Sequence, residues 1–103
     1  MAFCTDHLDG EQLKIAKIII SVLGPKANDN GNNSFVPPSE WSEKFGRDSS
    51  LVLVHDGGDL APYVNYDYGQ YALCQELDSA LEAAGYYVEQ CTCWYAAVYP
   101  VGV

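Results

Sequence analysis

The chain has 103 residues, of which 49% are hydrophobic and 18% charged, and its formal net charge is −9. One domain is expected at this length, since domains hold roughly 100–200 residues, and the hydrophobic content excludes a disordered chain. The negative charge argues against direct contact with nucleic acid or with anionic membranes. No apolar run approaches the roughly 20 residues of a membrane span, and residues 1–10 do not resemble a signal peptide, so a cytoplasmic location is expected.

The first predicted element is a helix over residues 10–23. Its expected apolar face consists of Ile15, Ala16, Ile19, Val22 and Leu23, which recur at helical spacing. Asp9 is the expected N-cap, and Gly24 followed by Pro25 is expected to end the helix. The β-branched run at residues 18–20 leaves a strand as the alternative, but length and period favour the helix.

The segment after this helix combines a loop with two short elements. Residues 24–34 are rich in Gly and Asn and predict a flexible loop. Residues 35–36 predict a short extended piece before two prolines. Ser39 resembles a helix N-cap and predicts a brief helix over residues 40–45, ended by Gly46.

Two strands separated by a turn are predicted next. The continuous apolar run at residues 51–54 is typical of a central buried strand. Residues 56–59 read Asp-Gly-Gly-Asp and predict a turn in which an Asp side chain hydrogen-bonds the backbone. Alternation along residues 62–66 predicts a second strand.

The C-terminal part predicts a helix followed by a hairpin. The helix is expected over residues 70–84 and is ended by Gly85. Its expected apolar face consists of Leu73, Leu77, Ala80 and Ala84, with Leu81 adjoining. Residues 86–91 and 94–99 are rich in aromatic and β-branched side chains and predict two paired strands.

This element pattern predicts an α+β fold. We expect a single domain, residues 1–103, with a small, mostly antiparallel sheet of three to five strands and two or three helices packed mainly on one face. A sheet covered on one side leaves the other side to water or to a partner. Tyr87, Glu89 and Trp94 are the residues expected near that open face.

The acidic charge belongs almost entirely to the second half of the chain. Residues 48–103 contain no Lys or Arg, yet they hold eight carboxylates and all eight tyrosines. Residues 1–47 are nearly balanced, with six acids against five basic residues. A surface of carboxylates and aromatic rings suits a basic protein groove, so the asymmetry predicts a basic protein partner.

The predicted helix at residues 70–84 carries an acidic stripe opposite its apolar face. Tyr71, Gln75, Asp78 and Glu82 follow one another along that stripe. Asp78 and Glu82 are like charges one turn apart, which costs about 0.2–0.5 kcal/mol. Glu82 also lies near the negative end of the helix dipole, which costs about 0.3–1 kcal/mol. Contact with basic residues of a partner would explain the pattern, and an ordinary solvated face is the alternative.

Tyrosines are concentrated just before this helix. Tyr63, Tyr66, Tyr68 and Tyr71 surround Asp67, so that phenol rings and a carboxylate lie side by side. Tyrosine is enriched at interaction hot spots, and its ring also receives arginine guanidinium groups. The candidate partner-binding residues of the chain are Asp67, Tyr68, Tyr71, Gln75, Asp78, Glu82 and Glu89.

A small enzyme or metal protein is the alternative class. It would be centred on His55, Asp56, Asp59 and Cys91, since a His, two carboxylates and a thiol suit acid–base chemistry or a metal. Their spacing fits no catalytic motif, and Asp-Gly-Gly-Asp is more typical of a turn. No catalytic residue, metal or cofactor is therefore predicted.

The four cysteines do not indicate a disulfide framework. Thiols in a reducing compartment stay free, so Cys4, Cys74, Cys91 and Cys93 are expected as thiols, with Cys74 in the core. A single C-x-C pair without a second pair is a weak signal for zinc.

In size, charge and lack of a catalytic signature, the chain resembles the small acidic inhibitors that phages and plasmids carry against host defence, such as anti-CRISPR and anti-restriction proteins. Several of these imitate the charge of DNA. The resemblance concerns general character over the whole chain and transfers no motif. It implies a non-enzymatic binder, in the host cytoplasm if the chain is phage-encoded, that occupies the groove of a basic nucleic-acid-binding protein or effector complex. Asp67, Asp78, Glu82 and Glu89 would then meet Lys and Arg in that groove. A homodimer, or a larger homo-oligomer that buries the open sheet face, is the third reading.

Overall fold

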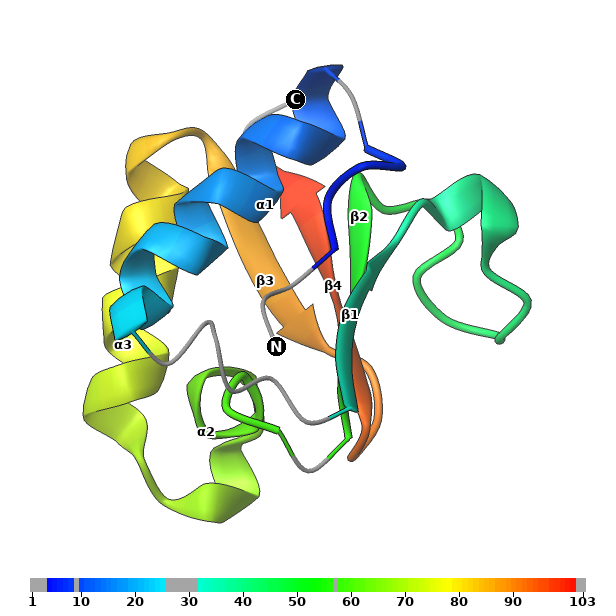
Figure 1. The fold of residues 1–103 in the computed structure, drawn as a ribbon. Coiled ribbons are helices and arrows are strands. Elements are labelled where there is room, and N and C mark those ends of the chain that lie inside the picture. Colours follow the sequence, from blue (N-terminus) through cyan, green and yellow to red (C-terminus); the bar gives the residue numbers. More distant parts are fainter. Residues whose placement is uncertain (1–3, 9, 26–31, 57, 102–103) are drawn as a thin grey trace.

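The computed structural model describes residues 4–8, 10–25, 32–56 and 58–101 (Figure 1). Its helices are α1 (Gly10–Leu23), α2 (Ala61–Val64) and α3 (Tyr71–Ala83), and its strands are β1 (Asn32–Val36), β2 (Leu51–Asp56), β3 (Tyr86–Gln90) and β4 (Tyr95–Pro100). Two short 3₁₀ turns, η2 (Pro38–Glu40) and η3 (Tyr66–Tyr68), complete the elements. They form one compact domain with extents of 28 × 28 × 25 Å.

The strands form one four-stranded antiparallel sheet in the order β1-β2-β4-β3. Leu53 in β2 pairs with Phe35 of β1 on one side and with Ala96 of β4 on the other. β3 and β4 form the predicted hairpin, in which Val88 pairs with Val98. The apolar run in β2 is therefore buried because a strand lies on each side of it, as the sequence predicts.

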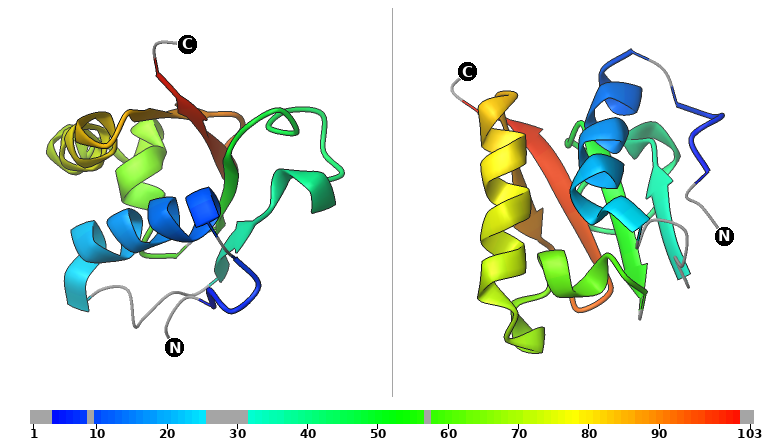
Figure 2. Two further views of the ribbon diagram at one scale, coloured as in Figure 1. Left: turned by 90° about the horizontal axis from the view of Figure 1, so that it is seen from above. Right: turned by 60° about the vertical axis from the view of Figure 1, so that its left-hand side comes forward.

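The helices all cover the same face of this sheet. α1, α2 and α3 lie on one side, and residues 37–50 pass along the other side (Figures 1 and 2). The core between helices and sheet includes Ile15, Ile19, Phe35, Leu51, Leu53, Leu77, Leu81, Ala96 and Val98. Burial of each large aliphatic side chain contributes about 1.5–3 kcal/mol. The predicted α+β fold is confirmed.

The two long helices end where the sequence predicts. Gly24 after α1 has φ +60° and Gly85 after α3 has φ +91°, a left-handed conformation that only glycine adopts without strain. The expected N-cap, Asp9, lies outside the described residues. In α3 the fully buried residues are Cys74, Leu77 and Leu81, whereas Leu73, Ala80 and Ala84 are only partly buried. The buried face is thus turned slightly from the predicted one, and it includes the thiol expected in the core.

The second face of the sheet is closed over β2 and β4. Val52, Tyr95 and Ala97 are buried there, although they point away from the helices. The Trp41 ring packs 4.9 Å from the Tyr95 ring in an edge-on arrangement. Gly46 lies over Val52 and Ala97, where an added Cβ would make ordinary contacts at 3.5 Å, and its φ of +94° favours glycine. The predicted open face is therefore limited to the part near β3.

Of the predicted loop at residues 24–34, residues 26–31 lie outside the described residues. The described part of residues 24–45 differs from the prediction in two places. Residues 32–34 belong to β1, so the strand is longer than the expected extended piece at residues 35–36. The predicted helix at residues 40–45 is wrong, because only the 3₁₀ turn Pro38–Glu40 forms. The Trp41 indole N–H donates to the Phe45 carbonyl at 3.0 Å. The indole ring packs against the Tyr95 ring on the sheet.

The predicted strand at residues 62–66 is also wrong, because this segment forms α2 and leads into η3. Pro62 is tolerated in the first turn of a helix, and the turn buries Ala61, Tyr63 and Val64. A pattern that short fits one helical turn as well as a strand. In the predicted turn at residues 56–59, Asp56 is the last residue of β2, and Gly57 lies outside the described residues.

Candidate protein-binding surface

The acidic stripe of α3 lies at the molecular surface. Tyr71 is 65% exposed, Gln75 and Glu82 are exposed, and Asp78 between them is partly buried. These four residues lie three or four positions apart, so they share one side of the helix. The buried residues Cys74, Leu77 and Leu81 lie on the adjoining side of α3, so the stripe borders the buried face and Asp78 is its most buried member.

The turn η3 extends this stripe with aromatic side chains. The Tyr66 and Tyr71 rings stack with centroids 6.3 Å apart and an interplanar angle of 28°. The Tyr66 hydroxyl donates to Asp78 Oδ2 at 3.4 Å. Tyr66 and Tyr68 are each 48% exposed, and Asp67 between them is exposed as well. We call the group Tyr66, Asp67, Tyr68, Tyr71, Gln75, Asp78 and Glu82 the α3 surface.

A buried asparagine fixes η3 in place. Asn65 Oδ1 accepts hydrogen bonds from the Asp67 backbone N–H at 2.9 Å and from Gln90 Nε2 at 3.2 Å. Its Nδ2 donates to the Cys93 carbonyl at 3.2 Å. Asn65 thereby connects η3 to the β3–β4 hairpin by hydrogen bonds, which hold the backbone that carries Tyr66 and Tyr68 in position. This residue was missed by sequence reasoning, since an Asn inside an expected strand gives no sign of this role.

The local electrostatics disfavour the charge that α3 carries. Burial raises the pKa of the Asp78 carboxyl, the nearby Glu82 raises it further, and the Tyr66 hydrogen bond opposes the rise. Burial and Asp78 raise the pKa of the Tyr66 hydroxyl. Burial and Asp78 also raise the pKa of the Cys74 thiol. A raised pKa disfavours the thiolate, which is the nucleophilic form of cysteine. A cation placed next to Asp78 would stabilise the charged form of this carboxylate.

Two of the predicted interface residues do not join the α3 surface. Tyr63 is 3% exposed and belongs to the core, because α2 turns it inward. Glu89 is exposed on β3, but it pairs with Ala97 and therefore points to the face away from the helices. The structure thus brings together Asp67, Tyr68, Tyr71, Gln75, Asp78 and Glu82 and leaves Glu89 on the opposite side of the sheet.

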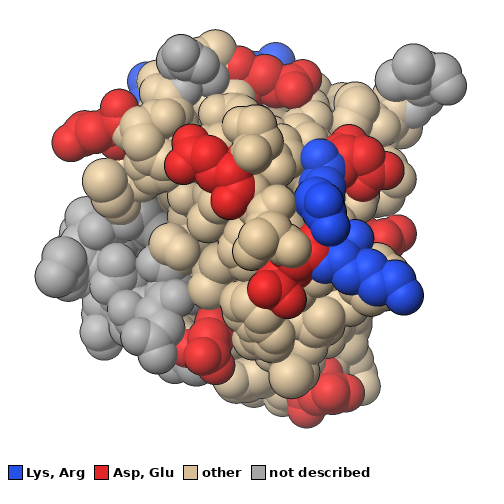
Figure 3. Space-filling view, turned by 90° about the vertical axis from the view of Figure 1, so that its right-hand side faces the viewer, with Lys and Arg blue, Asp and Glu red and all other residues tan. Residues whose placement is uncertain are grey.

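The carboxylates of the described residues all reach the surface, and only Asp59 and Asp78 are partly buried. Between described residues, no carboxylate forms a salt bridge with a Lys or Arg. On the face seen in Figure 3, acidic side chains are spread widely, while basic ones form one group on the right and are otherwise visible only at the upper edge. The negative charge is therefore left largely uncompensated.

The residues of the enzyme-like alternative differ in their surroundings. His55 is fully buried in β2, while Asp56 next to it is exposed at the end of the strand. Burial raises the pKa of the Cys91 thiol, and the nearby carboxylates of Glu89 and Asp48 raise it further. Within the described ranges, no group of three or more His, Cys, Asp and Glu side chains is placed to hold a metal ion.

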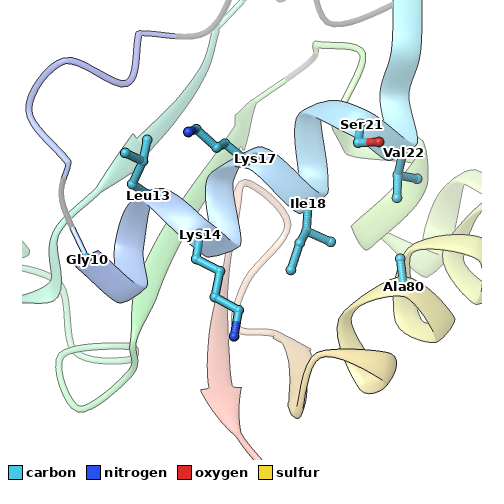
Figure 4. A pocket seen from close by; sticks show the side chains of 8 residues that line it. All are labelled: Gly10, Leu13, Lys14, Lys17, Ile18, Ser21, Val22 and Ala80. Atoms are coloured by element: carbon cyan, nitrogen blue, oxygen red, sulfur yellow. The ribbon is translucent and has the colours of Figure 1, made fainter.

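A hollow of about 590 Å³ lies on the outer side of α1, where sequence reasoning placed no site. Ile18 and Val22 face Ala80 of α3 across part of it (Figure 4). Lys14 and Lys17 also line the hollow, but they point apart. Lys14 Nζ lies 5.8 Å from the centroid of the Tyr86 ring, so this ammonium group already has an aromatic partner.

No helix among the described residues has the length and apolar character needed to cross a membrane. Comparison of the chain with protein-family models, curated proteins and solved structures gives no match.

Proposed function

We propose that the chain is a non-enzymatic acidic binding protein that attaches to a basic nucleic-acid-binding protein through the α3 surface. By occupying the groove in which the partner holds nucleic acid, it would inhibit or mask that partner. This is the action of the DNA-mimicking anti-CRISPR and anti-restriction inhibitors that the chain resembles.

One observation carries the proposal. Asp78 is partly buried beside Glu82 and has no cation partner among the described residues, while the stacked rings of Tyr66 and Tyr71 adjoin it. A helix alone would be more stable with a basic residue at either position. Exposed tyrosines next to unpaired carboxylates fit the side chains of arginine and lysine, which dominate nucleic-acid grooves.

The first test compares two charge-reversed proteins. Asp78→Lys with Glu82→Lys changes the α3 surface, and Asp56→Lys with Asp59→Lys makes the same change in charge at the end of β2. Proteins captured from a host lysate at low salt by the unaltered chain should bind nucleic acid, and duplex DNA should displace them. The α3 variant should bind the captured protein at least about tenfold more weakly, equivalent to about 1.4 kcal/mol, whereas the β2 variant should retain most of the affinity.

Ionic strength provides the second arm of this test. Affinity carried by exposed carboxylates should fall steeply as salt rises, because the Debye length shortens from about 10 Å at 0.1 M to about 3 Å at 1 M. An affinity that stays constant over this range, or that both charge-reversed proteins reduce equally, would contradict binding through the α3 surface.

A further inference from the structure

The sheet face away from the helices carries a second aromatic and acidic group, which we call the sheet surface: Asp48, Tyr87, Glu89 and Tyr99. Tyr87 and Glu89 alternate along β3, and Tyr87 pairs with Tyr99 of β4 in the sheet register. Tyr87 is 45% exposed, and Asp48 and Glu89 are exposed. Residues 37–50 close the same sheet face over β2 and leave these side chains accessible.

The contacts within the sheet surface bring three chain segments together. The Tyr87 and Tyr99 rings stack with centroids 5.5 Å apart and an interplanar angle of 22°. The Tyr99 hydroxyl donates to Asp48 Oδ1 at 3.3 Å. Asp48 is held next to β4 because the backbone N–H of Ser50, two residues later, donates to the Val98 carbonyl at 2.7 Å. The rings and the carboxylate are thus fixed before any partner arrives.

The charge at this surface is negative. Burial raises the pKa of Tyr99 to about 12, and Asp48 and Glu89 both contribute to the rise. Arg47 precedes Asp48 in the chain, but its Nε donates to the Glu43 carbonyl at 2.9 Å. Between described residues, neither Asp48 nor Glu89 has a salt bridge. The surface therefore has aromatic faces and carboxylates, and no Lys or Arg among the described residues forms an ion pair with it.

We propose that the sheet surface is a second binding site, which takes an arginine side chain from a basic segment of a partner protein. A guanidinium group is planar, stacks on aromatic faces and offers a fork of N–H donors to a carboxylate. Stacked tyrosines beside Asp48 and Glu89 supply both complements. A lysine ammonium group would meet the charge but would use the flat ring faces less well.

The same arrangement occurs on the α3 surface, where Tyr66 stacks on Tyr71 and donates to Asp78. The two surfaces lie on opposite sides of the sheet, since α3 covers one face and Tyr87, Glu89 and Tyr99 belong to the other (Figure 2). One copy of the chain would then hold two basic segments at once. This inference does not require the proposed function of the α3 surface.

The experiment uses the full chain and a blocked pentapeptide with two arginines, and the matching lysine peptide serves as a comparison. NMR titration should shift the ring resonances of Tyr87 and Tyr99 saturably, and the lysine peptide should bind about threefold or more weakly. Asp48→Asn with Glu89→Gln should lower the affinity for the arginine peptide, measured from the shifts of these resonances, by about fivefold or more. The control, Asp56→Asn with Asp59→Asn, removes the same charge elsewhere and should change the affinity less than about twofold.

Variants of the aromatic ring separate binding from folding. Tyr87→Phe keeps the ring and should retain the affinity, whereas Tyr87→Ala should lose it while the dispersion of the remaining resonances shows a folded protein. Asp78→Asn with Glu82→Gln should leave the shifts at Tyr87 and Tyr99 unchanged, so failure of one surface is distinguishable from failure of the other. Unmoved Tyr87 and Tyr99 resonances, or equal losses in the variant and the charge control, would overturn the proposal. So would light scattering that reveals a dimer in which a second copy covers this face.

Discussion

His55 is a buried imidazole at the end of a central strand. It is fully buried, and neither ring nitrogen has a hydrogen-bond partner among the described residues. Its position in β2 follows Leu51 and Leu53, so by alternation it points toward the helical layer. A buried polar group without a partner costs about 1–3 kcal/mol, so His55 works against stability rather than for it.

The pH dependence follows from the direction of the shift. Burial lowers the pKa of His55 below its ordinary value of 6.5, so the unfolded chain takes up a proton at a higher pH than the folded chain. The stability linked to His55 is thus fully present above 6.5 and is lost as the pH falls from 6.5 toward the lower folded value.

Replacement of this side chain gives the residue-scale prediction. His55→Leu keeps a similar volume, so the free energy of unfolding should rise by about 1 kcal/mol at neutral pH and should fall less on acidification. Urea denaturation at a series of pH values measures both effects. A large loss of stability in His55→Leu would mean that the ring has a partner, such as a bound group.

At the scale of the element, α3 contains acidic residues at positions where they lower the stability of the helix. Its last turn contains no basic residue, and Glu82 lies one turn after Asp78. Glu82→Lys removes the repulsion, suits the helix dipole and creates an attractive i, i+4 pair with Asp78. We expect the free energy of unfolding to rise by about 0.5–1 kcal/mol, measured by thermal and urea denaturation.

This gain should come with weaker binding to a basic partner, because the α3 surface loses a carboxylate and gains an ammonium group. Glu82→Gln should give about half of the gain in stability, since it only removes the repulsion and the unfavourable dipole interaction. A Glu82→Lys protein that is less stable than the unaltered chain would show that Glu82 has a structural role in α3.

Elements with many periodic residues could be predicted from the sequence, and short ones could not. α1, α3 and the β3–β4 hairpin follow from apolar spacing and glycine stops, which act locally. Residues 62–66 form a helical turn because Tyr63 and Val64 are drawn into the core, which is a tertiary effect. Residues after Trp41 do not continue a helix because the Trp41 ring packs on Tyr95 across the chain.

The part of the candidate surface that lies within one helix could be predicted, because helical spacing is a local property of the sequence. Tyr71, Asp78 and Glu82 belong to one helix, so helical spacing alone places them together. Glu89 was grouped with them by charge, but the strand register turns it to the opposite face. No signal in the sequence indicates that Asp48 meets Tyr99, because that contact depends on how residues before β2 lie against β4.

At the scale of the whole molecule, negative charge opposes folding. The net charge is −9, and the carboxylates of the described residues lie at or near the surface without salt bridges between described residues. A compact chain of like charges repels itself, and salt screens that repulsion. Stability should therefore increase with ionic strength.

We expect the free energy of unfolding to rise by about 0.5–1 kcal/mol between about 0.02 M and 0.5 M NaCl. Urea denaturation at each salt concentration measures the rise. The Asp56→Asn, Asp59→Asn protein should show a smaller dependence, because it carries less charge. A decrease of stability with salt would indicate that attractive ion pairs dominate the folded state.

The strand order has a consequence for how the chain reaches this structure. The central strands β2 and β4 come from distant parts of the sequence, with Leu51 paired to Val98, whereas β3 and β4 are neighbours in the chain. Closing a long loop before its contacts form is slow, so the hairpin with α3 is expected to form early and β2 to join it late. During synthesis on the ribosome, the second edge of β2 stays unpaired until β4 (Tyr95–Pro100) has been made. The nascent protein therefore passes through a stage in which its most apolar strand is open to association with other chains.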